Sequence, residues 1–186
     1  MAYPTHSAWK SMLRTYQYIS GTADLVISLP RKLDFAKLDA YGWEFYCDSD
    51  HASVAHPSNR RRSQYGYCAT LHGFPVLWMS KISSVAFASD KIGEAHATAS
   101  STESELYSAG NFSHDALALS YVCSENGIPF PKPIILRIDN AAAIQIIRGG
   151  SQARPKLRHV DCRMFCLRTL RDSDWFDVEH ARTDKN

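Results

Sequence analysis

The sequence lacks any apolar stretch long enough to span a membrane, and its N-terminus does not resemble a signal peptide. It also has no internal repeat, no low-complexity tract and no Cys-x-x-Cys pair among its five cysteines. These absences argue against a membrane protein, a repeat protein and a disulfide-stabilised secreted domain. They favour a reducing, intracellular setting in which most of the thiols are free and buried.

A strong excess of charge is also missing, because the formal net charge is only +2. Any contact with nucleic acid must therefore depend on local basic clusters rather than on the charge of the whole molecule. Two such clusters are present, one in HPSNRRRS and one in SQARPKLRH. The chain has 186 residues, 45% of them hydrophobic, which is sufficient for one globular domain with a proper core.

The pattern of apolar residues predicts an α/β fold with a mixed five-stranded sheet and helices on both faces. A helix over residues 5–20 and a short strand in LVISLP are expected to form an N-terminal connection segment, 1–40. The main domain, 41–186, is expected to contain these elements in order: a strand over about 43–48, a hairpin of QYGYCATLH and PVLWMS around Gly73, a helix from Ser101 to about Asn126, the strand PIILRID, the helix NAAAIQII, a helix to about Arg171 and the strand WFDVEH.

Three acidic residues occupy unusual positions in this pattern. Asp48 and Asp139 each end an apolar run, and ligands of open α/β sheets bind outside such strand ends. Glu105 lies on the apolar stripe of the long helix, where an acid is costly unless it is paired, neutralised or bound to a metal. Taken singly, each acid could instead be a turn residue, a helix cap or a partner of the helix dipole.

Three carboxylates that converge without a basic partner would repel one another and raise their pKa values. A hard divalent cation relieves this repulsion, and Mg²⁺ in particular prefers a few carboxylates together with water and phosphate oxygens. The three acids at matching points of one α/β order therefore favour a metal-dependent nuclease.

The same residues lie in motifs that resemble a known family. The motifs occur in the order PTHSAWKSMLRTYQYISGTADL, YCDSDHA, RRSQYGYCATLHGFPVLWMSK, ASSTESELYSA, IDNAAAI and KLRHVDCRMFCLR. Together they resemble the ribonuclease H domain of copia-type long-terminal-repeat retrotransposon Pol polyproteins, with part of the preceding reverse transcriptase connection. The resemblance extends over nearly the whole chain, and several motifs in the right order make it more specific than any one of them.

The resemblance implies a ribonuclease H-like fold and endonucleolytic hydrolysis of the RNA strand of RNA/DNA hybrids during reverse transcription. By position, the catalytic acids are Asp48, Glu105 and Asp139, which would hold two Mg²⁺ ions or Mn²⁺ in their place. In such a two-metal mechanism one ion lowers the pKa of the attacking water, and the other stabilises the departing 3′ oxygen.

The resemblance also implies contacts with the hybrid. Ser49, Ser104 and Asn140 are candidates to recognise 2′-hydroxyls near the acids. Candidates for phosphate contacts are Arg60, Arg61, Arg62, Arg154, Lys156 and Arg158. The expected partners are the hybrid and the reverse transcriptase region of the same polyprotein, with no membrane, and the expected location is a cytoplasmic virus-like particle or the nucleus.

The sequence departs from the family pattern in three places. His51 stands where a Trp is usual, and residues 82–97, which include Glu94 and His96, form an apparent insertion. A fourth acid downstream of the last strand is missing unless Asp184 substitutes for it, so we expect a domain truncated at its C-terminus. Two alternatives stay open: a catalytically impaired module that binds nucleic acid or a protein partner, and a nuclease of the same fold that cuts DNA.

Overall fold

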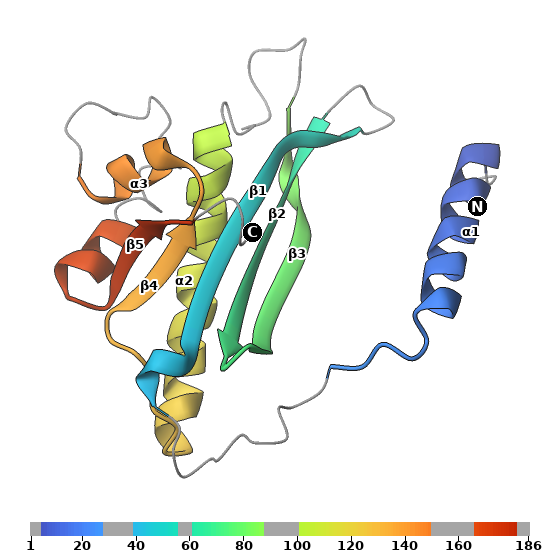
Figure 1. Cartoon of the computed structure of the whole chain (residues 1–186). Coiled ribbons are helices and arrows are strands. Elements are labelled where there is room, and N and C mark those ends of the chain that lie inside the picture. The colour runs from blue at the N-terminus through green and yellow to red at the C-terminus, as the bar shows by residue number, and fades with distance from the viewer. Residues whose placement is uncertain (1–4, 28–38, 56–60, 88–100, 150–165, 182–186) are drawn as a thin grey trace. The chain divides into compact units, whose positions relative to one another are not determined.

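The computed structural model describes residues 5–27, 39–55, 61–87, 101–149 and 166–181, without the side chains of 52–55, 61 and 83–87 (Figure 1). The chain divides into two compact units, Met1–Arg31 and Lys32–Asn186. The expected boundary at 40/41 stays a prediction. None of the helices in the described ranges is long and apolar enough to cross a membrane.

The first unit contains helix α1, His6–Gly21. Thr5 caps it, because the Thr5 hydroxyl oxygen accepts a hydrogen bond from the Ala8 N–H at 3.2 Å. This helix and its cap are as predicted. The strand expected in LVISLP is not formed at residues 25–27, and residues 28–30 lie outside the described ranges. A lone strand has no ladder partner to satisfy its backbone groups, so an apolar run alone does not produce one.

The second unit is built on a five-stranded sheet with the order β3-β2-β1-β4-β5 (Figure 1). A short 3₁₀ turn, η2 (Ala40–Gly42), leads into the sheet. The first three strands are antiparallel, and β1–β4 and β4–β5 are parallel, which confirms the predicted mixed sheet. Their bounds are β1 (Trp43–Ala55), β2 (Arg61–Leu71), β3 (Phe74–Phe87), β4 (Ile134–Ile138) and β5 (Phe176–His180).

The hairpin of β2 and β3 closes at His72 and Gly73, both with positive φ angles, 50° and 77°. Two successive positive φ values are typical of the type I′ turn, whose twist matches that of antiparallel strands. The hairpin around Gly73 was predicted, but its length was not. Strand β3 continues to Phe87, opposite Arg61 of β2, so 82–87 belong to the sheet and not to an inserted loop. Residues 88–97 of the expected insertion lie outside the described ranges.

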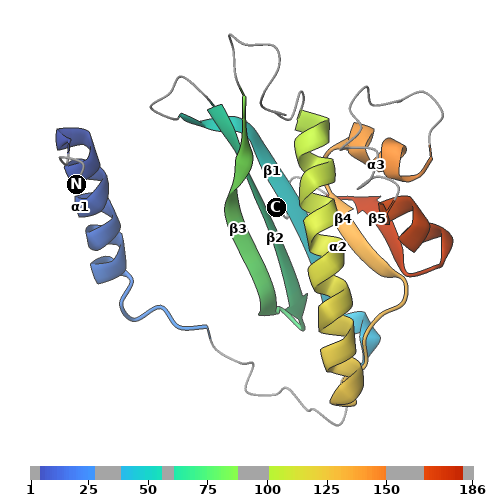
Figure 2. The same ribbon diagram turned by 180° about the vertical axis from the view of Figure 1, so that it is seen from behind.

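One face of the sheet carries the core. Trp43, Phe45 and Cys47 of β1 are buried on this face, as the predicted alternation requires. Helix α2 (Ser101–Glu125) covers it, with Phe112 fully buried against Phe45 at a ring-centroid distance of 5.7 Å. Figure 2 shows α2 on the side of the sheet that is hidden in Figure 1. Helix α3 (Ala141–Ile147) and a helix over 166–172 add buried side chains to the same core.

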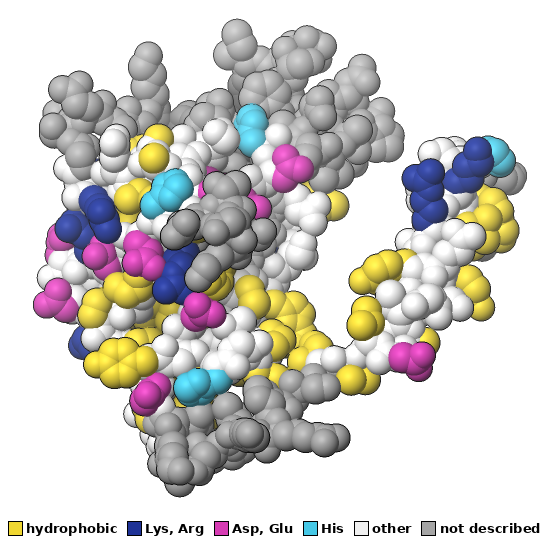
Figure 3. All heavy atoms as spheres, in the orientation of Figure 1, with side chains coloured by type: hydrophobic (Ala, Val, Ile, Leu, Met, Phe, Trp, Pro, Cys, Tyr) yellow, Lys and Arg dark blue, Asp and Glu magenta, His cyan; other side chains and the backbone are white. Residues whose placement is uncertain are grey.

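The opposite face carries a polar row centred on Arg137 of β4. Its guanidinium donates to Glu179 at 2.7 Å and to Glu44 at 3.3 Å, and it lies over the Tyr46 ring. Figure 3 shows acidic and basic side chains mixed over this side of the sheet. The helices expected on this face are not among the described elements, since α2, α3 and the helix over 166–172 all contribute to the one core.

Candidate active site

Asp48 lies inside β1 and not at its end, which corrects the expected strand of 43–48. Strand β2 pairs with β1 without interruption to Asp50 and, after an irregularity, again at Val54 and Ala55, so a largely polar segment extends the strand beyond its apolar part. The neighbouring strand β4, in contrast, ends at Ile138, one residue before Asp139, where its end was expected. The parallel register places Tyr46 beside Arg137, and continuing it by two residues brings Asp48 level with Asp139.

Glu105 approaches from the first turns of α2, and it is only 3% exposed. The Ser108 hydroxyl, one turn further along, bonds the backbone oxygens of Asp48 at 3.3 Å and Gly66 at 3.0 Å. Gly66 itself lies close to strand β3, because a Cβ atom there would lie 2.9 Å from the backbone oxygen of Met79. The start of the helix is therefore fixed against β1 and β2, with the Glu105 carboxylate turned towards β1.

The structure brings the three predicted acids together. Asp48, Glu105 and Asp139 each offer a carboxylate oxygen, and these three atoms all lie within 4.8 Å of one another. Asp48 and Asp139 are exposed, whereas Glu105 is buried. A cluster of this kind can take a hard divalent cation, with one buried ligand and two ligands that solvent and substrate can reach.

Ser49 joins two of the three acids. Its backbone N–H donates to Asp48 Oδ1 at 2.7 Å and to Glu105 Oε1 at 2.9 Å, and its hydroxyl donates to the same Oε1 at 2.8 Å. Glu105 Oε2 is buried and has no hydrogen-bond partner within the described part of the chain. A buried carboxylate oxygen without a donor is costly, and a cation would satisfy it.

The pKa of Glu105 is raised from 4.5 to about 7, mainly by burial and also by the charges of Asp48 and Asp139, while the hydrogen bonds from Ser49 lower it. Burial also raises the pKa of the Cys47 thiol, with Glu105 as the next contribution. Cys47 is therefore a neutral, buried neighbour of the acids and not a thiolate ligand.

The residues expected to contact nucleic acid have different surroundings. Ser104 is 2% exposed, which leaves almost no surface for a nucleic acid to touch. Asn140 caps α3, with its Oδ1 accepting from the Ala143 N–H at 3.0 Å. Arg62 is partly buried in β2, and Arg61 is in the same strand. Arg60, Arg154, Lys156 and Arg158 lie outside the described ranges, as do Glu94, His96 and Asp184.

The roles of Ser108 and Gly66 were not foreseen from the sequence. Both act through contacts between segments far apart in the chain, and a serine or glycine in an ordinary helix or strand gives no local signal of them. The link from Ser49 to Glu105 was also missed. Its position between two aspartates was the only available hint.

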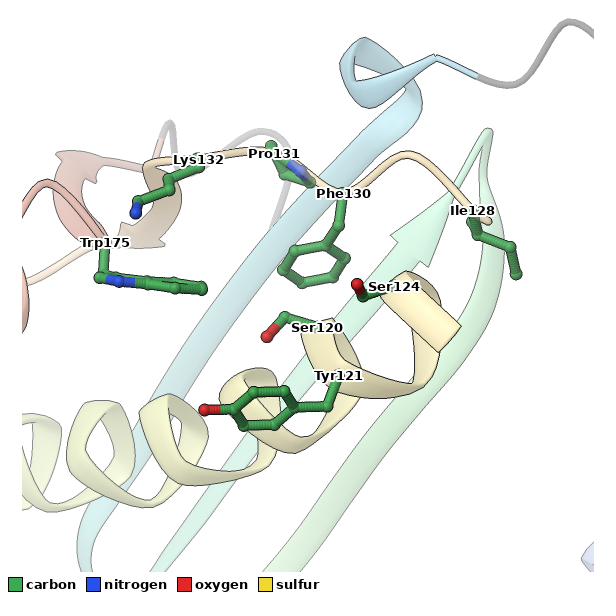
Figure 4. Close-up of a pocket in the computed structure, with 8 residues that line it drawn as sticks. All are labelled: Ser120, Tyr121, Ser124, Ile128, Phe130, Pro131, Lys132 and Trp175. Carbon is green, nitrogen blue, oxygen red and sulfur yellow. The ribbon is translucent and has the colours of Figure 1, made fainter. Parts of the chain in front are cut away.

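A pocket of about 320 Å³ lies elsewhere on the second unit (Figure 4). It is near the N-terminal ends of β4 and β5, whereas Asp139 follows the C-terminal end of β4. In the lining of this pocket, the Lys132 ammonium lies over the Trp175 ring, 4.2 Å from the ring centre. The pocket is lined by Ser120, Tyr121, Ser124, Ile128, Phe130, Pro131, Lys132 and Trp175, and none of these is a predicted site residue.

No family model matches the chain. The chain is 27% identical over 186 residues to the retrovirus-related Pol polyprotein from transposon RE2 of Arabidopsis thaliana. The alignment covers 98% of this chain but only 11% of that polyprotein.

Solved structures similar to the chain include LC11-RNase H1 in complex with an RNA/DNA hybrid, with 13% identity, 77% of this chain and 88% of that chain covered, and a TM-score of 0.48. The PFV RNase H domain is 12% identical to the chain, with a TM-score of 0.48. The match covers 76% of this chain and 79% of that domain. The predicted resemblance to a retrotransposon Pol polyprotein is thus confirmed over nearly the whole chain, and the sheet has the mixed five-stranded arrangement predicted for a ribonuclease H-like α/β fold.

Proposed function

We propose that the chain hydrolyses the RNA strand of RNA/DNA hybrids during retrotransposon reverse transcription. The observation that carries this proposal is the cluster of three carboxylates within 4.8 Å, at the point where β4 ends and α2 begins. The similarity to a retrotransposon Pol polyprotein supports the substrate class. The reverse transcriptase region of such a polyprotein is the proposed partner, in a virus-like particle or the nucleus.

The three acids fit Mg²⁺ by their chemistry. Their oxygens are hard donors, they lie close enough to share ions, and Glu105 keeps one buried oxygen without a hydrogen-bond partner in the described ranges. We assign Asp48, Glu105 and Asp139 as the ligands of two Mg²⁺ ions, for which Mn²⁺ can substitute. The chemistry supplied by the bound ions is a water of lowered pKa and stabilisation of the departing 3′ oxygen.

The residues of this chain would contribute position and electrostatics. Asp48 and Asp139 are exposed at the rim, where a phosphodiester can approach, and buried Glu105 forms the floor of the site. The neutral Cys47 thiol, 1% exposed, is buried near the acids without adding charge. Asn140 uses its Oδ1 to cap α3, so its side-chain N–H₂ group is the part that could donate to a phosphate or a 2′-hydroxyl.

The direct test is cleavage of a hybrid with a labelled RNA strand in Mg²⁺. The wild type should release fragments with 5′-phosphate and 3′-hydroxyl ends. Asp48→Asn, Glu105→Gln and Asp139→Asn should each reduce the rate by at least about a hundredfold, because each removes charge from the site. Asp172→Asn is the matched control, since Asp172 is exposed and lies outside the cluster, and it should cleave like the wild type.

The same assay separates the alternatives. Equal cleavage of double-stranded DNA would indicate a nuclease without selectivity for RNA. Binding of the hybrid without cleavage, in both Mg²⁺ and Mn²⁺, would contradict the proposed activity and leave a nucleic-acid-binding module.

A further inference from the structure

Ser49 is the residue through which the exposed and the buried acids of the cluster are connected. Three hydrogen bonds from this one residue reach two carboxylates, at 2.7 Å to Asp48 and at 2.9 and 2.8 Å to Glu105. Bonds to ionised acceptors are stronger than bonds between neutral groups. Since Asp48 and Glu105 repel each other when both are ionised, these donors favour the geometry in which the two carboxylates lie close.

The hydrogen bonds also distinguish the two oxygens of Glu105. Both donors of Ser49 meet at Oε1, which fixes the rotation of the carboxylate plane, while Oε2 has no partner within the described residues. A carboxylate held by one oxygen keeps the other for a different ligand. Ligand orientation by such outer hydrogen bonds commonly changes metal affinity by about tenfold to a hundredfold.

We propose that Ser49 is a positioning residue that holds Asp48 and Glu105 in the arrangement that binds a divalent cation. This inference rests on the proposed function, and it revises the expectation that Ser49 recognises the 2′-hydroxyl of RNA. A serine hydroxyl has a single proton to donate, and here Glu105 accepts it. Towards a 2′-hydroxyl, Ser49 can therefore only accept.

The test is Mn²⁺ binding to the full chain without nucleic acid, followed by the electron paramagnetic resonance signal of the free ion. Ser49→Ala removes the hydroxyl but keeps the backbone N–H, and it should weaken Mn²⁺ binding by about tenfold. Ser49→Thr restores a hydroxyl and should bind within about threefold of the wild type. Ser120→Ala is the control, because the Ser120 hydroxyl lies outside the acidic cluster and donates within its own helix, to the Leu117 oxygen at 2.7 Å.

A double-mutant cycle shows whether Ser49 acts through Glu105. In the Glu105→Gln background, where the charged acceptor is gone, the additional change Ser49→Ala should cost less than half of its effect in the wild type. An equal effect in both backgrounds would overturn the positioning role. The thermal unfolding of each variant is measured in EDTA. Weaker Mn²⁺ binding is attributed to the site only in variants that are as stably folded as the wild type.

The outcomes separate this inference from the proposed function. If Ser49→Ala binds Mn²⁺ as tightly as the wild type, the positioning role is overturned but the proposed function is not. Weak binding in both Ser49→Ala and Ser49→Thr has the same consequence. Weakened binding in Ser49→Ala, in a protein that cleaves no hybrid, supports the inference and contradicts the function. A wild type that binds no Mn²⁺ overturns both.

Discussion

Glu105 is an ionisable side chain in a place where ionisation is costly. It is 3% exposed, and two other carboxylates lie within 4.8 Å of its own. The Ser49 donors offset part of this cost, but burial and the neighbouring charges still raise the pKa of Glu105 to about 7. Such a residue reduces stability when it is charged, and a protein retains one of this kind most readily where it serves a site.

The raised pKa predicts how stability depends on pH when metal is absent. The folded state binds the Glu105 proton more tightly than the unfolded state, so this contribution to stability is complete below about pH 4.5 and is lost as pH rises through 7. The loss amounts to roughly 3 kcal/mol, because each pKa unit corresponds to about 1.36 kcal/mol.

Urea unfolding in EDTA at a series of pH values measures this contribution. The free energy of unfolding of Glu105→Gln should increase relative to that of the wild type between pH 4.5 and 7, since glutamine does not titrate. Glu103→Gln on the same helix is the control, and it should show a smaller change because Glu103 is only partly buried. Parallel curves for the wild type and Glu105→Gln would contradict the raised pKa.

At the scale of residues, the sequence allowed the acids to be predicted but not their support. Asp139 ends an apolar run and Glu105 interrupts an apolar stripe, so both stand out locally. The hydrogen bonds from Ser49 to Glu105 and from Ser108 to Gly66 join residues more than forty positions apart, and no local pattern encodes such contacts.

Helix α2 is the element that positions Glu105, and its packing on the sheet is centred on Phe112. This side chain is fully buried and meets the rings of Phe45 at 5.7 Å and Tyr67 at 5.6 Å. We predict that Phe112→Ala lowers the free energy of unfolding by about 3–5 kcal/mol, because it leaves a large cavity between helix and sheet.

The matched control for Phe112→Ala is Tyr121→Ala on the same helix, whose side chain is 67% exposed. It should change the free energy of unfolding by less than about 1 kcal/mol. Chemical denaturation followed by far-ultraviolet circular dichroism compares the two variants. Similar losses in both would contradict the central place of Phe112 in the core.

Elements with strong local signals were predicted well. Thr5 marks the start of α1, and Gly73 marks the hairpin turn. The lengths of β1 and β3 were underestimated because β1 is mostly polar after Asp48 and the KISSVAF part of β3 has no regular alternation of apolar and polar residues. Both parts are nevertheless strands, through pairing with β2. The apolar run Leu25–Ile27 shows the converse, since it has no described strand beside it and forms none. Pairing partners, more than composition, therefore decide where these strands end.

At the scale of the second unit, the site follows from the sheet order. Strand β1 is antiparallel to β2 on one side and parallel to β4 on the other. Pairing with β4 brings Asp139 beside Asp48. Pairing with β2 continues beyond Asp48 and supports the part of β1 that carries Ser49. The carboxylates thus gather at the point where the sheet changes from antiparallel to parallel pairing.

The division of the chain into Met1–Arg31 and Lys32–Asn186 leads to a prediction about the whole molecule. Among the residues that the structure describes, every buried hydrophobic residue of the core lies between Trp43 and Ala181, and no residue of α1 is buried. Removing residues 1–31 should therefore leave the core intact. We expect the shortened chain to unfold within about 2 °C of the full chain, since a change of 1 kcal/mol shifts the midpoint by several degrees in a domain of this size.

Differential scanning calorimetry of both chains, with Mn²⁺ titration of each, measures this independence. The shortened chain should also keep the Mn²⁺ affinity of the full chain, because Asp48, Glu105 and Asp139 all belong to the second unit. A drop of more than about 5 °C would show that the first unit stabilises the second. Unchanged unfolding with a lost metal site would show instead that α1 supports the acids without contributing to the core.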